Sequence, residues 1–123
     1  MDCEFHCSIR LKGSVKKSKH RLKECCTTVK TVLSNNPEYG VLVKGTGGLR
    51  KMRVRVPSLN VGKSGGYRLI YKALVIDEVW KIALLETYSK STREDLSSTE
   101  YHAVMREADD IFQRSEETTW ETL

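Results

Sequence analysis

The sequence lacks an apolar run long enough to cross a membrane, so no membrane partner is expected. Its first residues, MDCEFHCSIRLKG, lack the apolar stretch of a signal peptide. The four cysteines form no CxxC motif, and the adjacent pair Cys25-Cys26 is poor disulfide geometry. The three histidines have no ligand spacing to the cysteines, so neither a metal site nor a cofactor is expected. We therefore expect a cytoplasmic protein with reduced thiols, in which all 123 residues form one domain.

Acidic residues are missing from the segment between Lys44 and Lys72. The eight basic residues of this segment are Lys44, Arg50, Lys51, Arg53, Arg55, Lys63, Arg68 and Lys72. Residues 1–90 hold 18 Lys and Arg against 7 Asp and Glu, whereas residues 91–123 hold 3 against 9. Such an asymmetry predicts a face that binds a polyanion, with nucleic acid as the usual partner. The alternative is a solvated basic surface without a ligand.

A nucleotide-binding P-loop is also missing, although GKSGGYRLIY (Gly62–Tyr71) begins like the end of one. The motif needs a glycine five residues before Gly62 and a helix after Ser64. Pro57 occupies the first position, and strand-forming residues follow Gly66. The segment is therefore predicted to be a glycine-rich turn between two strands.

Hydrophobic periodicity and turn residues divide the chain into short strands and helices. The expected strands are Cys3–Ile9, Leu49–Val56, Tyr67–Val75 and Val79–Tyr88, and the expected helices are Ser14–Leu33 and about Ser97–Gln113. Tyr39–Gly48 is expected to be a loop, and residues 114–123 a frayed tail. Three successive strands with short connections indicate an antiparallel meander.

The predicted strand Leu49–Val56 alternates between cationic and apolar side chains. The cationic ones are Lys51, Arg53 and Arg55, and the apolar ones are Met52, Val54 and Val56. Because side chains on a strand alternate between two faces, the apolar set should face the core and the cationic set should form a row opposite. Neighbours in that row lie about 6.6 Å apart, which is comparable to the phosphate spacing of an extended single strand.

Five motifs in this order resemble the HigB/RelE family of toxins from bacterial and archaeal toxin–antitoxin modules. They are LSNNPEYG, KGTGGLRKMRV, GKSGGYRLIY, LLETYSK and EDLSSTE, and they cover roughly Leu33 to Glu100. The resemblance implies a compact α+β fold with a twisted antiparallel sheet and helices on one face. It also implies a metal-independent endoribonuclease that cleaves messenger RNA in the ribosomal A site. A cognate antitoxin, expected to be a helix-turn-helix protein, would block it.

The resemblance also implies which residues are catalytic. By motif position, Lys51 and Arg53 match two basic residues on the family's second strand. Arg68 matches the arginine at the start of the strand after the turn. Tyr88 and Lys90 match the region just past the last strand, which supplies a further catalytic side chain.

Metal-free RNA cleavage needs a base for the 2′-hydroxyl, cations on the phosphorane-like transition state and an acid for the leaving oxygen. Crowded cations lower one another's pKa, so Lys51 among arginines is the candidate base. Arg53 and Arg68 would clamp the phosphate. Tyr88 and Lys90 could position or protonate the leaving group, although Tyr88 could equally be an aromatic that covers the edge of the core.

Four further cations, Arg50, Arg55, Lys63 and Lys72, are predicted to bind RNA by general phosphate attraction. Two other classes of function stay open. A toxin resembling ParE would bind DNA gyrase and cut nothing, although such toxins tend to lack the basic row. A non-catalytic RNA-binding module is the other class, although aromatic stacking platforms are scarce in Leu49–Val56.

Overall fold

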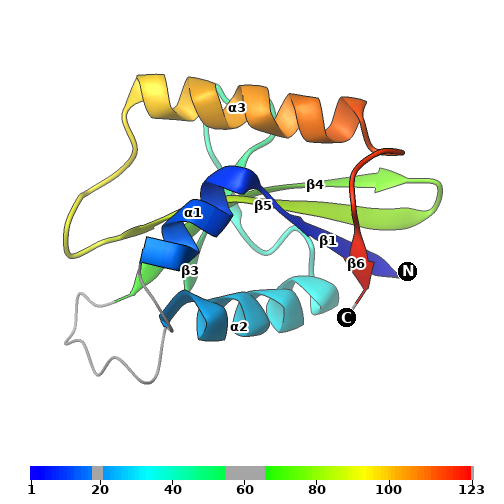
Figure 1. Cartoon of the computed structure of the whole chain (residues 1–123), viewed down its shortest axis with the longest axis horizontal. Helices are drawn as coiled ribbons and strands as arrows, with labels where there is room; N and C mark the ends of the chain where they lie inside the picture. Colours follow the sequence, from blue (N-terminus) through cyan, green and yellow to red (C-terminus); the bar gives the residue numbers. More distant parts are fainter. Residues whose placement is uncertain (18–20, 55–65, 123) are drawn as a thin grey trace.

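The computed structural model describes residues 1–17, 21–54 and 66–122. In chain order the elements are β1 (Cys3–Cys7), α1 (Ile9–Lys17), α2 (Arg21–Asn35), β2 (Val41–Leu42), β3 (Arg50–Val54), β4 (Tyr67–Ile76), β5 (Val79–Ser89), α3 (Ser98–Gln113) and β6 (Glu121–Thr122). The strands form one sheet in the order β2-β3-β4-β5-β1-β6 (Figure 1). None of the helices in the described ranges has the length and apolar character that a bilayer crossing requires.

Strands β3, β4 and β5 form the predicted antiparallel meander. β4 and β5 are joined by a two-residue turn in which Asp77 and Glu78 have positive φ angles of 51° and 65°. This geometry matches the twist of a hairpin, so the short connection expected between these two strands is confirmed. The first strand is confirmed as well, but β1 lies parallel to β5, with Phe5 opposite Ile82. The sheet is therefore mixed, because β1 is inserted beside the last strand of the meander rather than before its first.

The helices cover both faces of the sheet, which corrects the expectation of helices on one face. Figure 1 shows α2 and α3 on opposite sides of the strands. Leu69 and Leu84 pack with α1 and α2, whereas Ile70 and Leu85 pack with α3. Strands that are buried on both faces have continuous apolar runs, and residues 82–85 of β5 (Ile-Ala-Leu-Leu) form such a run. The mixed α+β fold class itself is confirmed.

The predicted helix Ser14–Leu33 is two helices, α1 and α2, and residues 18–20 between them lie outside the described residues. α1 begins earlier than predicted because Ser8 caps it. The Ser8 hydroxyl accepts a hydrogen bond from the Leu11 amide at 3.0 Å and donates one to the Leu85 carbonyl at 2.7 Å. A capping serine at this position satisfies an amide that the first turn would otherwise leave unpaired.

Residues 114–122 pack against the rest of the fold, so the prediction of a frayed tail is wrong for these residues. β6 pairs with β1, with Glu121 opposite Phe5. The indole of Trp120 lies 5.7 Å from the Phe112 ring and 5.8 Å from the His6 ring, and its N–H donates to the Ser115 carbonyl at 3.0 Å. Burying a large aromatic ring offsets the entropy of ordering the segment.

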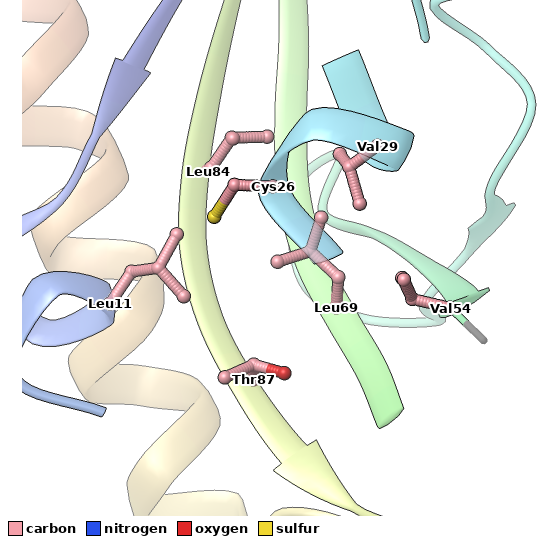
Figure 2. A pocket seen from close by; sticks show the side chains of 7 residues that line it. All are labelled: Leu11, Cys26, Val29, Val54, Leu69, Leu84 and Thr87. Atoms are coloured by element: carbon pink, nitrogen blue, oxygen red, sulfur yellow. The ribbon is translucent and has the colours of Figure 1, made fainter. Parts of the chain in front are cut away.

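A small cavity lies between the sheet and the two N-terminal helices (Figure 2). It is lined by Leu11, Cys26, Val29, Val54, Leu69, Leu84 and Thr87 and has a volume of about 10 Å³. A volume of this size holds at most about one water molecule. The cavity is a packing gap in the core and offers no room for a ligand.

Candidate functional site

Three of the predicted site residues lie side by side across the meander. In the strand register, Arg53 on β3 is opposite Arg68 on β4, and Arg68 is opposite Tyr88 on β5. Directly opposed residues on neighbouring strands bring their side chains within about 4.5–5.5 Å at Cβ. The strand alternation that buries Met52 and Val54 toward α2 leaves Arg53 on the face that α3 covers. The structure therefore brings Arg53, Arg68 and Tyr88 together.

Arg53 and Arg68, which we term the arginine pair, have no carboxylate partner among the described residues. The neighbouring cations Lys51, Lys72 and Lys90 each have one, at 3.0, 3.9 and 2.9 Å. Like charges directly opposed in a sheet are destabilising. An uncompensated pair of this kind has the geometry for binding an anion with two bidentate donors.

The arginine pair lines an open groove of about 450 Å³ beside the edge of the sheet. The groove is lined by Val41, Leu42, Val43, Lys44, Lys51, Met52, Arg53 and Arg68. Val41 and Leu42, on the edge strand β2, are 75% and 57% exposed. The volume falls within the range of about 300–1,000 Å³ that is usual for small-ligand sites. The groove can therefore accommodate an anionic group on the arginines next to an apolar group on β2.

A carboxylate that was not predicted, that of Asp95, joins this site. Its Oδ1 atom accepts hydrogen bonds from Lys51 Nζ at 3.0 Å, from the Tyr101 hydroxyl at 2.5 Å and from the Tyr88 hydroxyl at 3.3 Å. The backbone N–H of Leu96 donates to the same atom at 2.8 Å. Sequence reasoning sought cations and missed this residue, although Asp95 lies inside the quoted motif EDLSSTE.

The Asp95 cluster changes the role that Lys51 can have. Burial lowers the pKa of Lys51, but its hydrogen bonds to Asp95 and Tyr101 outweigh this and raise the pKa well above the ordinary value. Burial opposes ionisation of Asp95, yet hydrogen bonds from Tyr101 and Lys51 lower its pKa to about 2. Burial and the bond to Asp95 raise the pKa of Tyr101 to about 12. Lys51 is therefore a fixed ammonium, and the lowered pKa expected of a lysine base is not found.

Tyr88 covers the edge of the core, which is one of the two roles considered for it, and its catalytic role stays a prediction. Its ring is 7% exposed and belongs to the core beneath α3, so it does cover the edge of that core. Its hydroxyl nevertheless reaches Asp95 in the site. Lys90, in contrast, is paired with a residue of the following loop: its Nζ donates to the carbonyl and the carboxylate of Glu94 at 3.0 and 2.9 Å.

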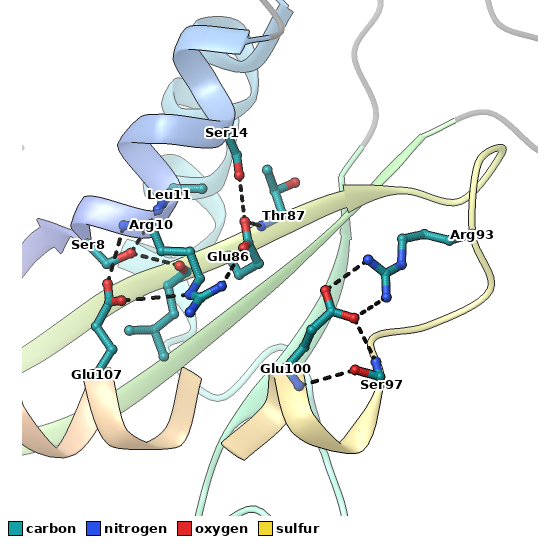
Figure 3. Close-up of polar contacts among 11 residues, drawn as sticks. Ser8, Arg10, Leu11, Ser14, Glu86, Thr87, Arg93, Ser97, Glu100 and Glu107 are labelled. Carbon is teal, nitrogen blue, oxygen red and sulfur yellow. Dashed lines mark hydrogen bonds and ion pairs between the residues drawn. The ribbon is translucent and has the colours of Figure 1, made fainter. Parts of the chain in front are cut away.

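The loop that carries Asp95 is fixed at the start of α3 (Figure 3). The guanidinium of Arg93 forms a two-pronged ion pair with Glu100. Ser97 and Glu100 form a capping box, in which the Glu100 amide donates to the Ser97 hydroxyl and the Ser97 amide donates to the Glu100 carboxylate. The loop therefore presents Asp95 from a rigid support.

A second polar network in Figure 3 supports the fold and lies on other residues. Glu86 on β5 accepts a hydrogen bond from the Ser14 hydroxyl at 2.7 Å and pairs with Arg10 at 3.7 Å. Arg10 also pairs with Glu107 of α3 at 3.8 Å. These contacts tie α1 to β5 and α3, although the buried Nε atom of Arg10 makes no hydrogen bond and meets Glu107 only as an ion pair.

Of the four further cations that were predicted to bind RNA, the two that the structure describes do not share the surroundings of the arginine pair. Arg50 is bound to the Gly40 carbonyl at 2.7 Å and to Glu38 at 3.1 Å, so it holds the loop before β2. Lys72 lies 3.9 Å from Asp109 and 6.0 Å from the centre of the Phe112 ring. Arg55 and Lys63 lie outside the described residues.

The sequence matches no protein-family model. A solved structure of an arginine-to-alanine double mutant of the Escherichia coli toxin RelE in the free state has a similar fold, with a TM-score of 0.54. The match has 19% sequence identity and covers 89% of this chain and 97% of that chain. The chain thus has a RelE-like α+β fold, and the HigB part of the resemblance stays a prediction.

Proposed function

We propose that this chain is a RelE-type toxin that cleaves messenger RNA on the ribosome without a metal ion and thereby stops translation. It would act in the cytoplasm and would be blocked by a cognate antitoxin, expected to be a helix-turn-helix protein. The observation that carries the proposal is the arginine pair, Arg53 and Arg68, opposed in register and without carboxylate partners in the described part of the chain. The RelE-like fold supports the same conclusion.

In the proposed reaction the 2′-hydroxyl oxygen attacks the adjacent phosphorus, and the bond from phosphorus to the 5′-oxygen breaks. The products are a 2′,3′-cyclic phosphate and a 5′-hydroxyl. Arg53 and Arg68 hold the non-bridging oxygens, on which negative charge develops. Lys51 adds a third positive charge, since it is protonated by its contact with Asp95.

Protonation of the leaving oxygen is assigned to residues at the edge of this cluster. Tyr88 offers a hydroxyl beside the arginine pair, and Lys90 offers an ammonium once it leaves Glu94. Either can protonate the leaving 5′-oxygen. With Lys51 held as a cation, its amine cannot accept the 2′-proton, which passes to a solvent water molecule.

A non-catalytic RNA-binding module is the second candidate, and one observation favours it. The amine that was expected to act as a base is fixed in its charged form. In that case the arginine pair and the groove would bind RNA and would not cut it.

Mapping of 5′ ends in growth-arrested cells and on programmed ribosomes decides between these functions. We expect new ends within translated codons and cyclic phosphates on the upstream fragments. When sulfur replaces a non-bridging oxygen of the scissile phosphate, thiophilic metal ions should not restore the cleavage rate, because the proposed reaction uses no metal ion. Intact messenger RNA with unchanged DNA supercoiling would favour the binding module, and intact messenger RNA with lost supercoiling would favour a gyrase-directed toxin.

A further inference from the structure

We propose that Asp95 is the positioning residue of this site: it fixes the Lys51 ammonium beside the arginine pair and orients the hydroxyls of Tyr88 and Tyr101. This inference rests on the proposed function, because it assigns a role within RNA cleavage. It concerns a residue that lies inside the motif EDLSSTE but to which the sequence assigned no role.

The geometry gathers four donors on a single carboxylate oxygen. Lys51 comes from β3, Tyr88 from β5, Tyr101 from α3 and the Leu96 amide from the loop itself. Lys51 is two residues from Arg53 on the same strand face, so the Cα atoms of these two residues are about 6.6 Å apart along the strand. The Oδ1 atom of Asp95 therefore links β3, β5 and α3 next to the arginine pair, where the phosphate is proposed to bind.

Asp95 is itself held in place, as a positioning residue must be. The next residue, Leu96, is 7% exposed and packs in the core beneath α3. The Nε atom of Arg93 donates to the Asp95 carbonyl at 3.1 Å, and Arg93 is anchored in turn by Glu100. The carboxylate cannot follow a moving substrate without disturbing these contacts.

A different role would be that of a plug, in which Asp95 occupies the phosphate position and is displaced by RNA. The contacts argue against it. A plug would neutralise the arginine pair, but Arg53 and Arg68 have no ion pair with Asp95. Displacement would also break the hydrogen bonds from both tyrosines. The carboxylate side chain is 47% exposed and Lys51 is 27% exposed, so RNA can approach the ammonium without removing Asp95.

The charged and titratable groups around Asp95 agree with this role. Lys51 faces it from β3, Tyr88 from β5 and Tyr101 from α3, while Arg93 and Glu94 belong to its own loop. The contacts with Lys51 and Tyr101 keep the carboxylate ionised, because together they lower its pKa to about 2. In return they keep Lys51 protonated far above neutral pH.

The first test is the titration of the Lys51 amine in the free protein, measured by competitive acylation and mass spectrometry. Asp95→Asn should lower the apparent pKa of Lys51 toward its ordinary value. The matched control is Asp110→Asn, which removes a carboxylate paired with Arg114 at the far end of α3 and should leave Lys51 unchanged. An unchanged Lys51 titration in Asp95→Asn would overturn the inference, whatever the protein does to RNA.

The second test is cleavage on programmed ribosomes. A displacement of about 1 Å in a catalytic group can cost about 10²-fold in rate, so Asp95→Asn should lose roughly that factor at saturation with KM unchanged or lower. Asp95→Glu keeps the charge and should recover part of the rate. A faster Asp95→Asn variant would identify a plug and overturn the inference. A wild-type protein that cleaves nothing would refute the proposed function, and the Lys51 titration would still decide the role of Asp95.

Discussion

Arg53 on β3 lies directly opposite Arg68 on β4, and neither guanidinium has a carboxylate partner in the described part of the chain. Directly opposed like charges weaken a sheet by a few tenths of a kcal/mol to about 1 kcal/mol. A protein that only needed a stable meander would gain by replacing one of them. This conflict between stability and local charge is typical of binding and catalytic sites.

The arginine pair should therefore show opposite effects on stability and on RNA binding. Arg53→Ala should leave the free energy of unfolding unchanged or raise it, because it removes a like-charge contact from an exposed position. The same change should weaken RNA binding and reduce the slope of log affinity against log salt by about one unit. Urea unfolding and binding measured across a salt series check both effects. A clearly destabilised variant with an unchanged salt slope would contradict this account of the pair.

The exposed edge strand β2 should contribute to the groove. Val41→Glu places a negative charge beside the arginine pair and should weaken RNA binding about tenfold, which corresponds to about 1.4 kcal/mol. Leu74→Glu is the matched control, because Leu74 is also an exposed strand residue but lies near the β4–β5 turn. Equal affinities for the two variants would show that the groove beside β2 does not take RNA.

The chain end should contribute to stability, since residues 114–122 are packed. Trp120→Ala removes the ring contacts with His6 and Phe112. It should lower the free energy of unfolding by about 1–3 kcal/mol, which is less than the loss expected for a fully buried aromatic. Tyr39→Ala, at a side chain that is 56% exposed, should cost much less. Urea unfolding measures both changes. A Trp120→Ala variant as stable as the wild type would contradict this prediction and would favour the frayed tail expected from the sequence.

The loop before α3 should make stability depend on acid pH. Hydrogen bonds from Arg93 and the Ser97 amide lower the pKa of Glu100 to about 2, and Asp95 has a pKa of about 2 as well. Both groups have lower pKa values folded than unfolded, so their contribution is full above about pH 4 and is lost as pH falls toward 2. Glu100→Gln should flatten that part of the stability curve, and Glu116→Gln should not. A wild-type curve that is flat between pH 4 and 2 would refute this.

Much of the meander could be predicted from the sequence because local patterns determine it. The alternation in Leu49–Val56 assigned the two faces of β3 correctly, and the short connection expected between Val75 and Val79 is the two-residue hairpin turn. The parallel pairing of β1 with β5 could not be predicted, because it joins residues 77 apart in sequence, such as Phe5 and Ile82. The same limit explains the tail: Trp120 finds its partners on β1 and α3, far from it along the chain.

The candidate site, like the fold, could be predicted only where local sequence patterns determine it. The arginine pair followed from strand alternation and the motif match, and the register places its two members opposite each other. Asp95 could not be found by a search for cations, since its role arises from contacts with Lys51, 44 residues away in sequence. That contact also reverses the expected direction of the Lys51 pKa: burial lowers this pKa, but the hydrogen bonds to Asp95 and Tyr101 outweigh burial and raise it.

The most direct test of the central claim is the single-turnover cleavage rate on saturating programmed ribosomes for wild type, Arg68→Ala and Lys72→Ala. A lost transition-state donor typically costs about 10²–10³ in rate, so Arg68→Ala should fall by that factor at saturation. Lys72 pairs with Asp109 outside the groove, so Lys72→Ala should weaken binding slightly and keep the saturated rate. If wild type and Arg68→Ala cleave at the same saturated rate, or wild type leaves no cyclic phosphate, the arginine pair is not the catalytic site proposed for this chain.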